Sequence, residues 1–223
     1  MKYLDLHSDK DVKNFQDLKL MEEFVCADAG VRVFLRRYEQ NQAVMIGQSV
    51  NDLSEGSLKK EKSLQHIISR EMAALILPSK LSFTEKGKPF SEGLAGISIS
   101  HTGGLVGLMT SEYFDCGLDL ERVSEKAIRV KMKFMSTNEE TITGQYFSPN
   151  EAATLVWSFK EACYKLHGKG GIPFLEGIFL REIDIINSRL RGGLNDGNKI
   201  VWVSGFFRFF EGMVLVYVIP EAT

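Results

Sequence analysis

The chain has few of the residues that would indicate a disulfide-linked, zinc-bound or membrane-embedded protein. Among its 223 residues there are only three cysteines and five prolines. Cys26, Cys116 and Cys163 are widely spaced and include no Cys-x-x-Cys pair, so the sequence favours neither a disulfide framework nor a cysteine zinc site. We therefore expect a reducing cytoplasm as the setting of this protein.

Long hydrophobic runs and an excess of one charge are also absent. No stretch approaches the eighteen apolar residues of a membrane-spanning helix, and charged residues stand where a signal peptide needs an apolar block. The net charge is -2 and the pI is about 6.1, which gives no support to nucleic-acid binding. Hydrophobic residues make up 44% of the chain, enough to fill a core. We expect a cytoplasmic protein that binds neither membrane nor nucleic acid.

Two segments have the pattern of long amphipathic helices. In residues 57–77 apolar side chains recur at helical spacing, and Pro78 prevents continuation. In residues 148–167 a similar stripe is preceded by Ser148 and Pro149, which suit a helix start, and is followed by Gly168, which suits a helix end. A weaker pattern predicts a third helix over residues 124–135.

Short strand-like runs surround these helices. They cover residues 31–38, 43–46, 96–100, 105–110, 116–120, 178–186, 200–207 and 213–219. The pattern predicts an α+β fold of two similar halves, residues 1–112 and 113–223, each with one long helix on a small antiparallel sheet. The sequence has no Pro- or Ser-rich linker between them, so we expect tightly packed halves and a monomeric chain.

Three carboxylates and a lysine indicate chemistry on a phosphorylated substrate. Asp119 and Glu121 are two residues apart on a strand-like run, so both side chains point to one face. Glu161 and Lys165 lie one turn apart on the second long helix. Converging carboxylates beside a lysine suit a magnesium ion that holds a phosphate group. The alternative for Glu161 and Lys165 is a surface ion pair worth about 0.2 to 0.5 kcal/mol.

The order of three motifs resembles the 4′-phosphopantetheinyl transferases, in particular the Sfp-type branch with two similar halves in one chain. The motifs are Gly87-Lys88-Pro89 with Ile97-Ser98-Ile99-Ser100-His101-Thr102, then Gly117-Leu118-Asp119-Leu120-Glu121, then Trp157-Ser158-Phe159-Lys160-Glu161-Ala162-Cys163-Tyr164-Lys165. The resemblance covers roughly residues 60 to 175. It implies magnesium-dependent transfer of the 4′-phosphopantetheine group of coenzyme A to a serine of an apo acyl or peptidyl carrier protein, with release of 3′,5′-ADP.

The resemblance also implies roles for individual residues. Asp119, Glu121 and Glu161 would bind the magnesium ion, and Lys165 would contact the pyrophosphate. The residues expected to bind other parts of coenzyme A are Arg70 at the 3′-phosphate, Gly87, Lys88 and Pro89 along the adenine, and Ser100 and His101 at the phosphates. Lys59, Lys60 and Lys62 are further candidates for the 3′-phosphate.

Two glutamates compete for the role of general base, because each follows an aromatic residue and a serine in the phrase that the family uses. Ser148 and Glu151 also fit a capping box at the start of the second long helix, which is a structural role. Glu139 is therefore the expected base, with Glu151 and a metal-activated water as alternatives.

A basic segment lies between the second and third motifs. Residues 122–133 contain five basic side chains and one acidic one, and carrier proteins of this system are typically acidic around the modified serine. We expect this segment to bind the carrier protein, although a helix face in contact with solvent alone would have the same composition. Two other functions remain open. One is a non-catalytic module that binds coenzyme A or a carrier, and the other is a metal-dependent enzyme acting on another nucleotide.

Overall fold

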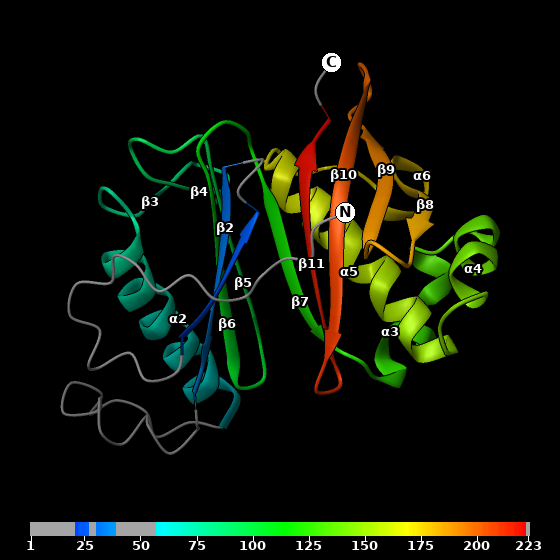
Figure 1. The fold of residues 1–223 in the computed structure, drawn as a ribbon, viewed down its shortest axis with the longest axis horizontal. Coiled ribbons are helices and arrows are strands. Elements are labelled where there is room, and N and C mark those ends of the chain that lie inside the picture. Colours follow the sequence, from blue (N-terminus) through cyan, green and yellow to red (C-terminus); the bar gives the residue numbers. More distant parts are fainter. Residues whose placement is uncertain (1–20, 27–29, 39–56, 222–223) are drawn as a thin grey trace.

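The structure, a computed structural model, describes residues 21–26, 30–38 and 57–221, with side chains described from residue 30 to 38 and from residue 64 onward. Two antiparallel sheets lie side by side, each with one long helix (Figure 1). The predicted strand at residues 43–46 and the side chains of Lys59, Lys60 and Lys62 lie outside the described residues.

The first sheet has four strands and is covered by the first long helix. Its strands, in spatial order, are β1 (Met21–Cys26), β2 (Val31–Arg37), β6 (Leu105–Ser111) and β5 (Gly96–Thr102), and the helix is α2 (Ser57–Ile76). Leu64, Ile68 and Met72 on α2 are buried against Val106 and Leu108 of β6. These helix residues have the spacing that the sequence pattern predicted.

The second sheet has five strands and packs on the second long helix. Its strands, in spatial order, are β7 (Gly117–Arg122), β11 (Met213–Pro220), β10 (Ile200–Phe210), β9 (Arg189–Asn195) and β8 (Ile178–Asp184). The helix is α5 (Pro149–His167). Smaller elements are the hairpin β3 (Ser82–Phe83) and β4 (Pro89–Phe90), the helices α3 (Glu125–Arg129), α4 (Thr137–Gly144) and α6 (Phe174–Gly177), and the 3-10 turn η4 (Lys131–Lys133).

The ends of α5 are set by the residues that the sequence indicated. Ser148 and Glu151 form a capping box and Pro149 occupies the first turn. Gly168 ends the helix in the left-handed conformation with φ of +65°, which a residue with a Cβ adopts only at a cost. The helix therefore keeps a fixed length, which fixes the position of the side chains in its last turn.

The two sheets meet at a seam formed by β5 and β7. The Ser98 hydroxyl accepts a hydrogen bond from the Leu118 backbone N–H at 2.9 Å, and the Ser100 hydroxyl accepts one from Leu120 N–H at 3.1 Å. Further from this seam, apolar side chains of β2 and β6 pack against those of β7 and β11. These serine hydroxyls bind the backbone N–H groups at the edge of β7, so the edges of two strands can lie next to each other inside the protein without unpaired polar groups.

One sequence prediction needs correction, and two elements were not predicted. The helix predicted over residues 124–135 is interrupted at Val130, whose φ of -114° and ψ of 10° separate α3 from η4. The short helix α4 has no strong apolar stripe and was not predicted. Strand β9 was not predicted either, because Gly192 and Gly193 weaken its strand pattern. Gly192 is nevertheless required there, since a Cβ at this position would lie 2.2 Å from the Phe179 carbonyl oxygen.

The predicted α+β class is confirmed, and both long helices and the strands around residues 31–38, 96–120 and 200–219 are present. The similarity of the two halves and the boundary near residue 112 stay predictions. In the described part of the chain, no helix has both the length and the apolar character needed to cross a membrane.

Candidate functional site

The close approach of β7 and α5 builds the site at the seam. A Cβ on Gly117 would lie only 1.9 Å from the Ala162 carbonyl oxygen, so no residue with a side chain fits there without moving the helix. This contact places Asp119, two residues further along β7, beside the last turns of α5. The glycine in Gly-x-Asp-x-Glu therefore has a packing role.

Asp119 is the centre of a polar cluster. Its carboxylate is buried, and its Oδ1 accepts hydrogen bonds from Lys165 Nζ at 2.7 Å and from the Ser100 hydroxyl at 3.1 Å. Lys165 also donates to Ser100 Oγ at 2.9 Å and to the Leu118 carbonyl at 3.0 Å. The cluster joins β5, β7 and α5, so the predicted residues Ser100, Asp119 and Lys165 do come together.

The two other predicted carboxylates lie in the same electrostatic neighbourhood. Burial, and after it the charge of Asp119, raises the pKa of Glu121 to about 7. The same two causes raise the pKa of Glu161. Glu121 Oε1 accepts a hydrogen bond from Trp157 Nε1 at 3.2 Å, which opposes the upward shift. Asp119 thus repels both glutamates, while Lys165 attracts them.

The donor set fits a hard divalent cation in part. Asp119 Oδ2 is buried and accepts no hydrogen bond from the described residues, and the repulsion between Asp119 and each of the two glutamates is what a 2+ charge would relieve. Yet no three His, Cys, Asp or Glu side chains of the described residues are grouped closely enough to hold an ion as they stand. Lys165 neutralises Asp119 instead. Metal binding by Asp119, Glu121 and Glu161 therefore stays a prediction.

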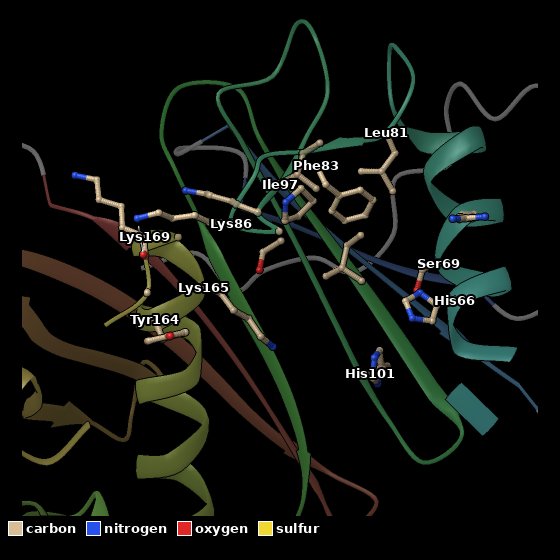
Figure 2. A pocket seen from close by; sticks show the side chains of 18 residues that line it. His66, Ser69, Leu81, Phe83, Lys86, Ile97, His101, Tyr164, Lys165 and Lys169 are labelled. Atoms are coloured by element: carbon tan, nitrogen blue, oxygen red, sulfur yellow. Dashed lines mark hydrogen bonds between the residues drawn. The ribbon is translucent and has the colours of Figure 1, made fainter. Parts of the chain in front are cut away.

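A cavity of about 670 Å³ lies beside this cluster, between α2, the β3–β4 hairpin, β5 and the end of α5. Tyr164 and Lys165 project from α5 on one side and His66 and Ser69 from α2 on the other, with Ile97 of β5 between them (Figure 2). Of the residues predicted to bind coenzyme A, the wall includes Arg70, Gly87, Lys88, Pro89, His101 and Lys165. Ser100 is the exception, because its hydroxyl is buried in the Asp119 cluster.

The cavity wall is basic and partly apolar. The described residues that line it include no aspartate or glutamate, and those with basic groups are His66, Arg70, Lys86, Lys88, His101, Lys165 and Lys169. Partial burial, and then the charge of Lys165, lowers the pKa of His101. The apolar part comes from Leu81, Phe83, Pro89, Ile97 and Ile99. Such a surface suits a ligand with several negative charges and one flat apolar group.

Lysines of the β3–β4 turn attach this wall to α5. Lys88 Nζ donates to the Leu166 carbonyl and to Asp115, both at 2.7 Å, and Lys86 Nζ donates to the Lys169 carbonyl at 3.0 Å. The methylene groups of Lys88 therefore line the cavity, while its ammonium group binds a backbone carbonyl at the end of α5. Gly168 leaves room for it, since a Cβ there would lie 2.3 Å from Lys88 Cδ.

Glu139 lies in different surroundings. Its side chain is buried, its Oε1 lies 2.9 Å from the buried Lys160 ammonium and accepts from Leu180 N–H, and its Oε2 accepts from Ser136 in a capping box. The sequence favours Glu139 over Glu151 as the general base because a capping box is evident only at Glu151. The structure has a capping box at both glutamates, so this reason does not hold. Neither lines the cavity. Both act as helix caps, and Glu139 also balances a buried charge.

Several wall residues were not predicted. Tyr164 lines the cavity, although the sequence motif assigned it no role. A signal was present, because Trp157, Glu161 and Tyr164 follow one another at i, i+4 and i+7, which is the spacing of one helix face. His66 likewise lies one turn before Arg70 on α2. Phe83 and Lys169 had no motif around them, and only the tertiary arrangement brings them to the cavity.

The raised carboxyl pKa values predict a stability that falls with pH when no metal is present. Folded Glu121, with a pKa near 7, binds its proton more tightly than the unfolded chain, whose value is near 4.5. That contribution is present below pH 4.5 and is lost as the pH rises through 7. We expect the free energy of unfolding in EDTA to lose on the order of 1 to 3 kcal/mol between pH 5 and 8, after allowing for partial exposure.

The measurement is denaturant unfolding at both pH values, in EDTA and in excess Mg²⁺. Glu121→Gln should flatten the pH dependence, and Mg²⁺ should restore stability to the unmutated protein at pH 8. An equal pH dependence in the protein and in Glu121→Gln would contradict this assignment.

Comparison with known proteins gives one family. Residues 115–204 match the family model described as the 4′-phosphopantetheinyl transferase superfamily, and no curated protein matches the chain. The matched segment starts just before β7 and ends within β10, so it includes Asp119, Glu121, Glu161 and Lys165. The motif from Gly87 to His101 lies outside it. Residues 115–204 of the chain are therefore similar to the 4′-phosphopantetheinyl transferase superfamily.

Proposed function

We propose that this protein transfers the 4′-phosphopantetheine group of coenzyme A to a serine of an apo acyl or peptidyl carrier protein, with Mg²⁺ and with release of 3′,5′-ADP. The observation that carries the proposal is the adjacency of the basic cavity and the carboxylate cluster, joined by Lys165, which belongs to both. The superfamily of residues 115–204 supports transfer of phosphopantetheine in general.

Coenzyme A has the chemistry that the cavity suits. Its 3′-phosphate and pyrophosphate need cations, and its adenine needs an apolar wall. We assign the 3′-phosphate to Arg70, whose guanidinium can make two charge-assisted bonds to a phosphate. Phe83, Pro89 and Ile97 supply apolar surface for the adenine, while His101 and Lys165 lie on the side of the carboxylate cluster and take the pyrophosphate.

In the proposed reaction the serine oxygen forms a bond to the β-phosphorus as the bond to the leaving 3′,5′-ADP breaks. A magnesium ion, held by Asp119, Glu121 and Glu161, would neutralise the oxygens that gain charge. Lys165 supplies a second positive charge at the pyrophosphate. The serine proton is proposed to pass to a water molecule in this cluster, because Glu161 already serves as a metal ligand and its raised pKa holds only without the ion. Glu139 would first have to leave Lys160 to take this role.

The test is release of 3′,5′-ADP from coenzyme A, followed by chromatography. The proposal requires that release depends on both the apo-carrier protein and the divalent metal. A serine-to-alanine carrier is the matched control and should give none. If coenzyme A binds but no 3′,5′-ADP forms with any carrier, the protein is a binding module. If 3′,5′-ADP forms equally without a carrier, the protein is an enzyme that acts on a different substrate.

Replacing Arg70 with Ala is expected to raise the KM for coenzyme A by roughly 10-fold or more, because a lost charge-assisted contact costs about 1.5 to 3 kcal/mol. The KM for 3′-dephospho-coenzyme A should change little. Arg70 is exposed in the structure, so the unfolding temperature should not fall. An equal rise in KM for both substrates would place Arg70 outside the 3′-phosphate site.

The carrier protein is proposed to bind at α3 and η4. Here Lys126, Arg129 and Lys133 are exposed, and the apolar side chain of Met132 is 78% exposed, which gives a basic surface with an apolar centre. Ile128 and Met135, by contrast, pack into the core. An acidic helix with one apolar contact is the partner that such a surface complements.

Reversing the charge of Arg129 and Lys133 to Glu together should weaken carrier binding, most strongly at low salt. Exposed charges act mainly on association and are screened over about 10 Å at 0.1 M. Arg129 pairs only with the exposed Glu125 among its described partners, so folding should hardly change. The matched control reverses the exposed Arg181 and Arg189 on β8 and β9. Unaltered KM for the carrier at low salt would place the carrier site elsewhere.

A further inference from the structure

We propose that Trp157 is a positioning residue for the metal site: its indole N–H holds the carboxylate of Glu121 in the orientation that binds the ion. This inference rests on the proposed function, because it takes Glu121 as a metal ligand. The observation behind it is the hydrogen bond from Trp157 Nε1 on α5 to Glu121 Oε1 on β7, at 3.2 Å. Nothing in the motif itself indicates a partner for this indole.

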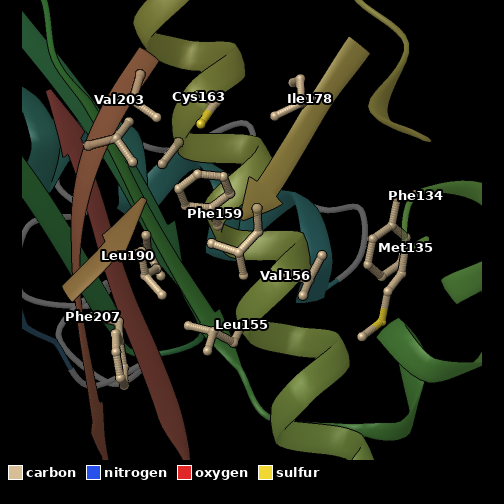
Figure 3. Packing of buried hydrophobic residues seen from close by; sticks show 14 of the residues in the cluster. Phe134, Met135, Leu155, Val156, Phe159, Cys163, Ile178, Leu190, Val203 and Phe207 are labelled. Carbon is tan, nitrogen blue, oxygen red and sulfur yellow. The ribbon is translucent and has the colours of Figure 1, made fainter. Parts of the chain in front are cut away.

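The indole is held rigidly on both sides. Its ring meets Phe134 edge to face, with centroids 5.0 Å apart at 73°, and lies against Phe174 at 5.3 Å and 41°. Aromatic pairs in such geometry are worth about 0.5 to 1.5 kcal/mol beyond the area they bury. Phe134 is buried in the core that covers α5 (Figure 3). The N–H therefore points in one direction before any ligand arrives.

A buried ion pair anchors the backbone of Phe174, which carries one of these two rings. The carbonyl of Phe174 accepts a hydrogen bond from Lys160 Nζ at 2.8 Å, and Lys160 is in turn paired with Glu139. The lysine is fully buried, so its position depends on these partners and not on water. Lys160 in the third motif thus acts through Phe174 and Trp157, which explains a motif lysine that does not line the cavity.

Glu121 needs such a holder because its neighbours repel it. Asp119 lies close enough to raise its pKa, and a free side chain at the end of β7 would turn toward water. In the described part of the chain, the bond from Trp157 engages Oε1 and no hydrogen bond engages Oε2. Trp157 and Glu161 are one helical turn apart, so α5 presents one metal ligand and the donor that orients another.

The test is Mn²⁺ binding without substrate, measured by the paramagnetic signal of the free ion. Trp157→Phe keeps an aromatic ring and removes the N–H. Its affinity for Mn²⁺ should fall by roughly 10-fold or more, the loss typical of outer-shell partners of metal ligands. Replacing Trp157 with benzothienylalanine, an isostere with sulfur in place of N–H, should have the same effect with the packing preserved. Trp202→Phe, which alters the other tryptophan, should bind as the unmutated protein does.

A second readout uses the fluorescence of Trp157 itself. In Trp202→Phe it is the sole tryptophan, and Mn²⁺ or Mg²⁺ should change its emission, because the ion binds the carboxylate that the indole contacts. Unchanged affinity in the benzothienylalanine protein overturns the inference and leaves the proposed function in place. Failure of the unmutated protein to bind Mn²⁺ without coenzyme A would overturn this inference alone, because coenzyme A phosphates can complete a metal site, whereas absence of 3′,5′-ADP release would overturn the transfer reaction.

Discussion

Asp119→Asn and Glu161→Ala are each expected to reduce the transfer rate by at least about 10²- to 10³-fold while the fold is kept. The loss of one preorganised electrostatic contact to a phosphoryl-transfer transition state typically costs this much. Asp119 Oδ1 pairs with Lys165, whereas the buried Oδ2 accepts no hydrogen bond from the described residues and would be available to a cation. Asp119→Asn leaves Lys165 without its partner, so we expect its unfolding temperature, measured without metal, to fall, and the rates are compared below that temperature.

Glu112→Gln is the matched control for these variants, because it removes an exposed carboxylate on the loop before β7. Its transfer rate should equal that of the unmutated protein. A rate for Asp119→Asn or Glu161→Ala within a few-fold of normal at saturating Mg²⁺ would show that the reaction does not use this cluster.

Glu139→Gln is expected to destabilise the protein by about 3 to 5 kcal/mol, because it leaves the buried Lys160 charge without its partner. Glu151→Gln can keep the other capping box, because Gln also fits it, and removes only a charge at the start of α5, so it should cost less than about 1 kcal/mol. Denaturant unfolding of the two variants measures the difference. Adding Lys160→Met to Glu139→Gln removes the unpaired charge and should recover part of the loss.

The same variants test Glu139 as the general base. If Glu139 is structural, transfer by Glu139→Gln should keep most of its rate at a temperature where the variant is folded. Near-normal stability together with a rate loss of two or more orders of magnitude would instead make Glu139 the base.

The elements that were predicted correctly are those whose signals are local. The apolar stripe of α5, its serine cap and its terminal glycine are all within one stretch of sequence, and the structure has them where they were expected. Asp119 and Glu121 are on one strand for the same reason. The packing of β7 against α5 is a tertiary contact between segments about 40 residues apart, and only the order of the motifs indicated it.

The features that were not predicted depend on neighbours far along the chain. Glu139 became a buried ion-pair partner because Lys160 reaches it across the packing of α4 and α5. Ser100 was expected at a phosphate, but the edge of β7 and Asp119 take up its hydroxyl. In β9, Gly193 gave no strand signal, although its pairing with β8 and β10 holds that strand in the sheet.

The most direct measurement of the central claim is the intact mass of a panel of apo-carrier proteins after incubation with this protein, coenzyme A and Mg²⁺. The account predicts that at least one carrier gains the mass of one phosphopantetheine group on its serine, and that EDTA or Asp119→Asn prevents the gain. No mass change in any carrier, with folded protein and coenzyme A bound, would contradict it.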